Sequence, residues 1–299
     1  MPELDDELRA RLRRRYGAGI DAWFAALPAV LADLGERWQL TWGPFIRRGS
    51  MSVVIRCRTA DERPAVLKVC PDRARLAREA AVLAGWETAH VPDVLAVDEN
   101  AGALLLEAIE PGTPLAELPT VPSVIELGDL MSSLHDTRVP DQAYQPVSDR
   151  VLHLFGSGTK PYELKPELVE LVPRELYERG RRLALRLAAD PARTVVLHGD
   201  LTPVNVLDGG PERGLVAIDP APCLGDPAFE AVDFVLWRAK DVDVIAARAE
   251  ALAPAIGADP RRLLDWCTAF AGMIALELAE LSATSPDEIE PFLALAARA

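Results

Sequence analysis

The sequence predicts an α+β protein with two lobes, an antiparallel sheet with flanking helices at the N-terminus and a mainly helical lobe at the C-terminus. Short β-rich segments alternate with turn residues between positions 39 and 107, which is typical of an antiparallel meander. Beyond position 114, apolar residues recur mainly at helical spacing. A Pro- and Gly-bearing connector, 110–114, lies at this change, so we expect one lobe at 1–110 and another at 111–299.

The N-terminal lobe is expected to start with helices inside 3–38. Leu4, Leu8 and Leu12 form one helical stripe, and residues 20–38 continue the same spacing. A helix is also predicted at 72–88, after the first strands. The expected strands are 39–45, 52–58, 64–69, 94–97 and 103–107.

The C-terminal lobe ends in a segment with a clear helix start. Ser285 is a suitable cap, Pro286 suits the first turn, and Glu288 follows the cap by three residues. Residues 137–165 contain several prolines and glycines, which predicts a long loop placed to cover a cleft. Helices are expected at 122–136, 166–189, 227–239, 242–254, 259–282 and 285–298.

Composition restricts the partners of the chain. The net charge is −14, which opposes binding to nucleic acid or to an anionic membrane and favours a cation. The same charge is equally consistent with a surface that only keeps the protein dissolved. No long apolar run or basic leader is present, and four cysteines are scattered without a C-x-x-C pair, so we expect a cytoplasmic protein with reduced thiols.

The segment 195–219 carries the strongest functional signal. Two aliphatic runs, predicted as buried strands, flank a polar loop with Asp200 and Asn205, and Asp219 ends the next run. This is the order in which a kinase places its proton acceptor and two metal ligands. Each residue alone is commonly a turn or cap residue, but the combination predicts phosphoryl transfer with ATP and Mg²⁺.

Lys68 and Glu79 are the expected anchors of the nucleotide phosphates. Lys68 lies among apolar residues of a predicted strand, where burial requires a partner, and Glu79 on the next helix is the natural counter-charge. The alternative is an edge lysine that reaches water, with Glu79 paired to Arg75 or Arg78.

Two further segments are candidates for nucleotide binding. The turn around Gly49 and Ser50 precedes the Lys68 strand and offers backbone N–H groups to a phosphate, although a single glycine is more often only a turn former. The carbonyl of Glu107 and the N–H of Ile109 offer adenine one acceptor and one donor, although the segment alone also fits a buried strand.

Together these motifs resemble the aminoglycoside phosphotransferases, and most closely the streptomycin 6-phosphotransferase and hydroxyurea phosphotransferase group. The resemblance covers nearly the whole chain. It is carried by the Trp-rich N-terminal helices, Ala65-Val66-Leu67-Lys68, Leu104-Leu105-Leu106-Glu107 with Pro111-Gly112-Thr113-Pro114-Leu115, His198-Gly199-Asp200, Ala217-Ile218-Asp219-Pro220 and Gly225-Asp226-Pro227-Ala228-Phe229.

The resemblance implies a protein-kinase-like fold and ATP-dependent phosphorylation of an antibiotic hydroxyl. Asp200 then orients the hydroxyl and accepts its proton, and Asn205 and Asp219 bind Mg²⁺. His198 braces the loop, and Asp226 accepts loop N–H groups. Pro220 after the metal-binding Asp219 departs from protein kinases, which carry Phe-Gly there, but the phosphotransferase group tolerates it. Thr202 in the loop and a single glycine in the phosphate turn depart from the pattern of closer relatives.

The expected acceptor is a small, cationic, hydroxylated molecule such as streptomycin. Carboxylates near the cleft would bind its cationic groups, although each candidate is equally consistent with an ordinary surface helix residue. Trp237, Trp266 and Phe270 either stack on the ligand or belong to the core. Two alternatives stay open, a kinase for another acceptor (hydroxyurea, a peptide antibiotic, an amino alcohol or a sugar) and a nucleotide-binding regulator without turnover. The candidate carboxylates are Glu230, Asp233, Glu277 and Glu280.

Overall fold

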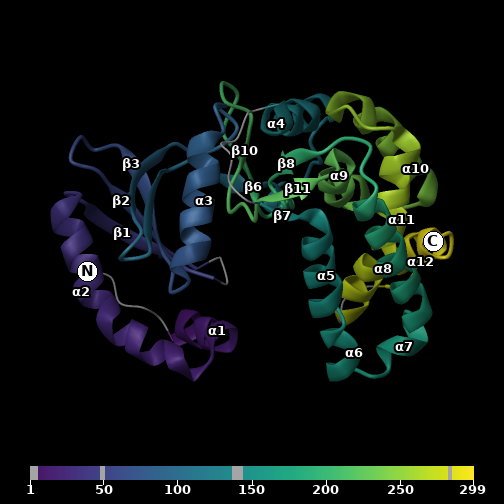
Figure 1. Cartoon of the computed structure of the whole chain (residues 1–299), viewed down its shortest axis with the longest axis horizontal. Coiled ribbons are helices and arrows are strands. Elements are labelled where there is room, and N and C mark those ends of the chain that lie inside the picture. The colour runs from purple at the N-terminus through teal and green to yellow at the C-terminus, as the bar shows by residue number, and fades with distance from the viewer. Residues whose placement is uncertain (1–5, 48–50, 137–143, 282–284) are drawn as a thin grey trace. The chain divides into compact units, whose positions relative to one another are not determined.

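The computed structural model describes residues 6–47, 51–136, 144–281 and 285–299 (Figure 1). The chain divides into two compact units, Met1–Gly112 and Thr113–Ala299. Gly49 and Ser50, the expected phosphate-binding turn, lie outside the described residues.

The first unit is built on a five-stranded antiparallel sheet. Its strand order is β1-β2-β3-β5-β4, so β3 is the central strand. Helix α3 (Arg73–Gly85) packs against β4 and β5. This arrangement confirms the antiparallel sheet that was predicted. The strands are β1 (Thr41–Ile46), β2 (Val53–Arg58), β3 (Pro64–Val69), β4 (Val94–Asp98) and β5 (Ala103–Glu107).

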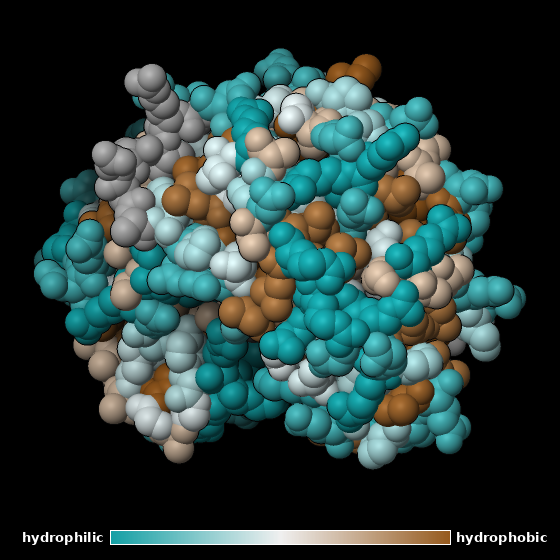
Figure 2. All heavy atoms as spheres, turned by 45° about the vertical axis from the view of Figure 1, so that its right-hand side comes forward, coloured by the Kyte–Doolittle hydropathy of each residue, from teal (hydrophilic) through white to brown (hydrophobic). Residues whose placement is uncertain are grey.

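Two N-terminal helices share a core with this sheet. Buried leucines of α1 (Asp6–Tyr16) and α2 (Asp21–Arg37) pack in one apolar cluster with Ile55, Leu67 and Val69 of the strands. The helical stretch 18–37, which includes the short helix η1 (Ala18–Ile20), is long and apolar enough to cross a membrane by length and composition alone. Its buried face belongs to this core. On the face of the molecule seen in Figure 2, hydrophobic residues are interspersed among hydrophilic ones.

The second unit is a helical assembly around α11 (Pro260–Glu280), which packs against α8, α9, α10 and α12. Trp266 and Phe270 of α11 are buried and lie against Phe229 and Phe155, so both belong to the core. The other helices are α4 (Val124–Asp136), α5 (Val147–Ser157), α6 (Lys160–Leu164), α7 (Leu168–Leu171), α8 (Arg174–Ala189), α9 (Pro227–Leu236), α10 (Val242–Leu252) and α12 (Pro286–Ala296), with the 3₁₀ turns η2 (Leu115–Glu117) and η3 (Ala253–Ile256).

Two small sheets cross the second unit. One has the order β10-β9-β6 and the other β7-β11-β8. The loop between β8 and β9 therefore runs from one sheet to the other, which fixes both of its ends. The strands are β6 (Thr113–Pro114), β7 (Gln145–Pro146), β8 (Val195–Leu197), β9 (Val206–Asp208), β10 (Leu215–Ala217) and β11 (Cys223–Gly225).

The prediction of a loop at 137–165 is wrong over its described part. Residues 147–157 and 160–164 form α5 and α6, while 137–143 lie outside the described residues. Val147, Val151 and Phe155 recur every four residues and are buried, and this stripe stabilises α5 despite the nearby glycines and prolines. The single helix expected at 166–189 is also broken into α7 and α8, because Pro173 interrupts it.

Candidate active site

The loop after β8 has a backbone that only glycine suits at its second position. Gly199 adopts φ +77°, and a Cβ there would lie 2.1 Å from the carbonyl oxygen of Ala221. Because glycine has no Cβ, the loop can lie directly against the segment that leads into β11. Asp200 follows directly, and 37% of its side chain remains exposed, so its carboxylate is open to a ligand.

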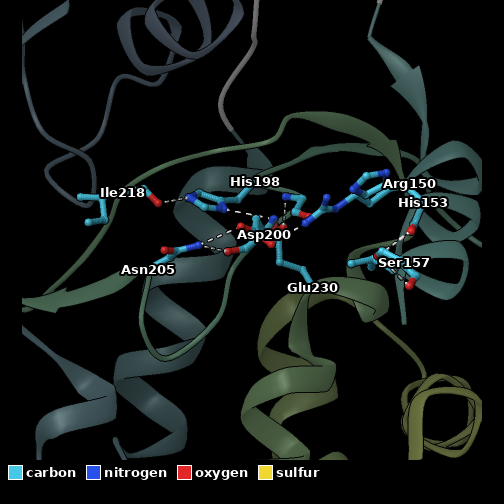
Figure 3. Close-up of polar contacts among 10 residues, drawn as sticks. Arg150, His153, Ser157, His198, Asp200, Asn205, Ile218 and Glu230 are labelled. Carbon is cyan, nitrogen blue, oxygen red and sulfur yellow. Dashed lines mark hydrogen bonds and ion pairs between the residues drawn. The ribbon is translucent and has the colours of Figure 1, made fainter. Parts of the chain in front are cut away.

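His198 is buried beneath this loop and is a structural partner of Asp200. Its Nε2–H donates to the carbonyl of Ile218 at 3.0 Å, and its Nδ1 accepts the Asp200 N–H at 3.4 Å (Figure 3). Burial lowers the pKa of His198, against the opposing effects of Glu230 and Asp200. A neutral ring with this tautomer joins the loop to the end of β10.

Asn205 holds Asp200 from the other end of the loop. Its Nδ2 donates to the Asp200 carbonyl at 2.8 Å and to the carboxylate Oδ2 at 3.0 Å. These two bonds assign the remaining amide atom as oxygen. The Asn205 carbonyl also accepts the Ile218 N–H at 2.8 Å, which brings the loop next to Asp219.

Asp219 follows β10 with φ +60°, in the left-handed region that few residues other than glycine adopt. The charges of Asp200 and Asp219 both act to raise the pKa of the buried His198, so both carboxylates lie near its ring. Within the described parts of the chain, no group of three or more His, Cys, Asp or Glu side chains is arranged to hold a metal. The donor set Asn205 Oδ1 and Asp219 nevertheless fits Mg²⁺, which takes one or two protein oxygens together with phosphates and waters.

Arg150 is a site residue that the sequence interpretation missed. It lies in the first half of α5 and donates from Nε to the Gly199 carbonyl at 2.8 Å and from Nη2 to Oδ1 of Asp200. Asp200 therefore lies between Asn205 and Arg150, as Figure 3 shows. The apolar spacing of 147, 151 and 155 was the signal that could have placed Arg150 on a helix.

Glu230 was expected as a substrate contact or a surface residue, but it is buried under the loop. Its Oε1 accepts the Gly199 N–H at 2.8 Å, and its Oε2 lies 3.0 Å from Nε2 of His135 on α4. Burial alone would raise the pKa of Glu230, but the hydrogen bond and charge of His135, together with His198, bring it below its ordinary value. Its carboxylate is thus engaged by the protein itself.

Asp226 caps α9 and is also fully engaged. Its Oδ1 accepts the Ala228 N–H at 2.9 Å, and its Oδ2 accepts from Trp266 Nε1 at 3.1 Å and from Arg262. The expected acceptance of a backbone N–H is present, and the two side-chain donors of α11 add to it. Asp226 therefore joins α9 to α11.

The other acidic candidates lie on α9 and α11. Asp233 is one helical turn beyond Glu230, and its pKa is raised to about 7 by burial, by Glu277 and by Asp200, with Arg150 opposing. Glu277 is exposed as a residue, but its carboxyl group is crowded by protein atoms, and this desolvation and Glu280 raise its pKa. Glu280 accepts a hydrogen bond from Lys165 at its backbone carbonyl, 2.7 Å. Asp233 is thus the candidate that the structure brings next to Asp200.

Lys68 and Glu79 form a buried ion pair in the first unit. Lys68 lies on the central strand β3, where Leu67 and Val69 face the core shared with α1 and α2. Since side chains alternate across a strand, Lys68 faces the other side, where its Nζ contacts Oε1 of Glu79 on α3. Only 4% of Lys68 and 2% of Glu79 are exposed, so the alternative of an edge lysine reaching water is wrong.

The expected adenine-binding segment follows β5. The Ala108 N–H donates to the Pro64 carbonyl toward β3 at 3.2 Å, and the Glu107 N–H donates to the Asp93 carbonyl on the opposite side at 2.9 Å. Because the N–H and C=O of one strand residue point to the same side, the carbonyl of Glu107, the last residue of β5, points away from β3. The role of the Glu107 carbonyl and the Ile109 N–H in adenine binding stays a prediction.

Known proteins resemble this chain along most of its length. A streptomycin 6-kinase from Streptomyces glaucescens is 29% identical over 287 residues, covering 88% of this chain and 87% of that protein. A hydroxyurea phosphotransferase from Kitasatospora aureofaciens is 30% identical, covering 88% and 76%. A solved macrolide 2′-phosphotransferase from Brachybacterium faecium superposes with a TM-score of 0.54 at 20% identity, covering 91% and 97%.

The similarity to the solved structure confirms the protein-kinase-like fold. Residues 37–281 match the sequence profile described as aminoglycoside/hydroxyurea antibiotic resistance kinase. That match covers both units and includes each residue from Lys68 to Glu280 discussed above. The chain therefore belongs to the aminoglycoside/hydroxyurea antibiotic resistance kinase family and is a phosphotransferase.

Proposed function

We propose that the protein transfers the γ-phosphoryl group of ATP, with Mg²⁺, to a hydroxyl of an aminoglycoside such as streptomycin. The observation that carries the proposal is the Asp200 carboxylate, which is accessible yet held through both of its oxygens by Arg150 and Asn205. A fixed carboxylate orients an attacking hydroxyl and accepts its proton as the phosphoryl group transfers.

The other residues have separate roles in this proposal. Asn205 and Asp219 would hold Mg²⁺, which supplies charge neutralisation for the phosphates. Lys68, kept in place by Glu79, would bind the nucleotide phosphates. His198 is neutral and buried, so it holds the loop and does not accept the proton.

A cationic acceptor is supported by the charge around Asp200. Asp233 and Glu277 raise the local negative charge, with Arg150 as the opposing cation. Binding of guanidinium or ammonium groups would relieve this repulsion. The names of the relatives, a streptomycin 6-kinase and a hydroxyurea phosphotransferase, offer one cationic and one uncharged acceptor for comparison.

The direct experiment incubates the protein with MgATP and a panel of acceptors. Streptomycin, hydroxyurea, an amino alcohol and a sugar are compared by mass spectrometry of the acceptor, which detects the added phosphoryl group. We expect streptomycin to be phosphorylated fastest. If only another acceptor is phosphorylated, that acceptor replaces streptomycin as the proposed substrate. If nucleotide binds and no acceptor is phosphorylated, the result favours a regulator without turnover.

Asp219→Ala is expected to weaken the binding of MgATP by at least about 10- to 100-fold, the range typical of changing even a residue that supports a metal ligand. Binding of ATP without Mg²⁺ should change little, because the lost carboxylate acts through the metal. Isothermal titration with and without Mg²⁺ measures both values. Glu212→Ala, at an exposed position in the β9–β10 hairpin, is the control, and equal weakening with and without metal would remove Asp219 from the metal site.

Asp233→Asn is expected to stabilise the fold above pH 7 and to raise the KM of a cationic acceptor. The folded-state pKa of about 7 lies above the ordinary value of 3.8, so the folded protein binds the extra proton. The free energy of unfolding of the wild type therefore falls as pH rises from about 4 to 7. The Asp233→Asn variant avoids this loss because its amide does not titrate. We expect a gain of about 1 to 3 kcal/mol at pH 8 and none at pH 3.

Urea unfolding at both pH values measures this gain, and Glu250→Gln on the exposed face of α10 is the control. In the wild type, the affinity for a cationic acceptor should rise as pH passes 7, because Asp233 then becomes charged. An unchanged KM in Asp233→Asn would show that this carboxylate does not contact the acceptor.

A further inference from the structure

Arg150 contacts two consecutive residues of the loop with one planar group. Its Nε donates to the carbonyl of Gly199 at 2.8 Å, and its Nη2 donates to Oδ1 of Asp200. Nε and Nη2 share an edge of the guanidinium, so the bonds fix the backbone and the carboxylate together. Figure 3 shows this contact on the side of Asp200 opposite Asn205.

The helix that carries Arg150 is anchored to the same sheet as the loop. Strand β7 pairs in parallel with β11 and leads directly into α5. Val147 packs so closely on Gly225 that a Cβ there would lie 2.5 Å from the Val147 Cβ. Val147 and Val151 are buried on either side of Arg150, so the guanidinium is presented from an ordered turn.

Charge explains why a cation is needed at this position. His198 is the only basic residue from 198 to 205, and burial lowers its pKa, so the loop has no positive charge of its own. Asp233 lies close enough to Asp200 for the two carboxylates to repel each other. Within the described parts of the chain, Arg150 is the cation paired with Asp200, and only 18% of its side chain is exposed.

We propose that Arg150 is a positioning residue for phosphoryl transfer, which holds the Asp200 carboxylate in the orientation that receives the acceptor hydroxyl. The proposal rests on the function proposed above. Arg150 occupies one lone pair of Oδ1 and Asn205 one of Oδ2, so each oxygen retains a lone pair for the hydroxyl. A lysine carries its three donors on one nitrogen and lacks the planar pair, so it does not reproduce the geometry of both contacts.

The test compares Arg150→Met, Arg150→Lys and Arg150→Ala with Arg182→Met. Arg182 forms an exposed ion pair with Glu175 on α8 and is the matched control. We expect Arg150→Met to lower kcat for streptomycin by about 10- to 100-fold with little change in the KM for ATP, because misplacement of a reacting group affects the chemical step. Arg150→Lys should recover only part of the loss, and millimolar guanidinium ion should raise the kcat of Arg150→Ala.

A second readout does not depend on turnover. Amide hydrogen exchange of residues 199–205 should be faster in Arg150→Met than in the wild type and unchanged in Arg182→Met. If the wild type phosphorylates no acceptor, the proposed function fails, whereas faster exchange confined to Arg150→Met still supports the hold on Asp200. An increase in kcat in Arg150→Met would overturn the proposal, because the contact would then be inhibitory. Unchanged exchange and unchanged kcat would overturn it as well.

Discussion

Asp200→Asn is expected to lower kcat for acceptor phosphorylation by about 10²- to 10⁴-fold, the usual contribution of a positioned general base. The amide cannot accept the proton of the hydroxyl. Its NH₂ group also replaces an oxygen that accepts from Asn205, so the held orientation is lost. Affinity for MgATP should stay close to the wild-type value, because phosphate binding is assigned to other residues.

Steady-state kinetics with streptomycin and titration with MgATP measure the two effects separately. Asp243→Asn, at an exposed position in the first turn of α10, controls for loss of a carboxylate elsewhere in the same unit. A fall in kcat of less than about tenfold would be below the range for a general base and would leave Asp200 with an orienting role at most.

Glu230→Ala is expected to lower the free energy of unfolding by about 3 to 5 kcal/mol, the cost of removing one partner of a buried charged contact. The change leaves the Gly199 N–H and Nε2 of His135 without the carboxylate that now binds them, in the protein interior. Urea unfolding followed by circular dichroism measures the loss. Glu175→Ala, at an exposed ion pair on α8, should change stability by less than about 1 kcal/mol.

Glu230→Gln separates the shape of the side chain from its charge. Its amide oxygen can still accept the Gly199 N–H, so the loss of stability should be smaller than for Ala. Full wild-type stability in Glu230→Ala would mean that the buried contact with His135 contributes no net stabilisation. In that case the loop would depend on its contacts with Arg150, Asn205 and His198.

Local patterns in the sequence were sufficient to predict most helices and strands. The strands of the first unit alternate or carry continuous apolar runs, and the C-terminal helices carry apolar stripes. Helix α5 was missed because its stripe of Val147, Val151 and Phe155 lies between Pro146 and Gly156, and residues of these two types indicate a loop. The nearby proline and glycine were given more weight than the four-residue period of buried side chains.

Contacts between distant segments could not be predicted from the sequence. Glu230 was expected at the surface or on the substrate because its partner His135 is 95 residues away. Arg150 reaches Asp200 across 50 residues, and no local spacing encodes that approach. The pairing of Lys68 with Glu79, separated by 11 residues, was predicted from the strand and the helix that follows it. Only the strand order shows that β3 is central.

The hydrogen bonds described here for the Asp200 loop come from the unit Thr113–Ala299, whereas Lys68 and Glu79 pair within Met1–Gly112. Under the proposed roles, substitutions in Thr113–Ala299 away from Arg150, Asn205 and Glu230 can therefore change the choice of acceptor while Lys68 and Glu79 stay unaltered. We expect the sequence differences that change which antibiotic is accepted to lie mostly in the unit that carries Asp200.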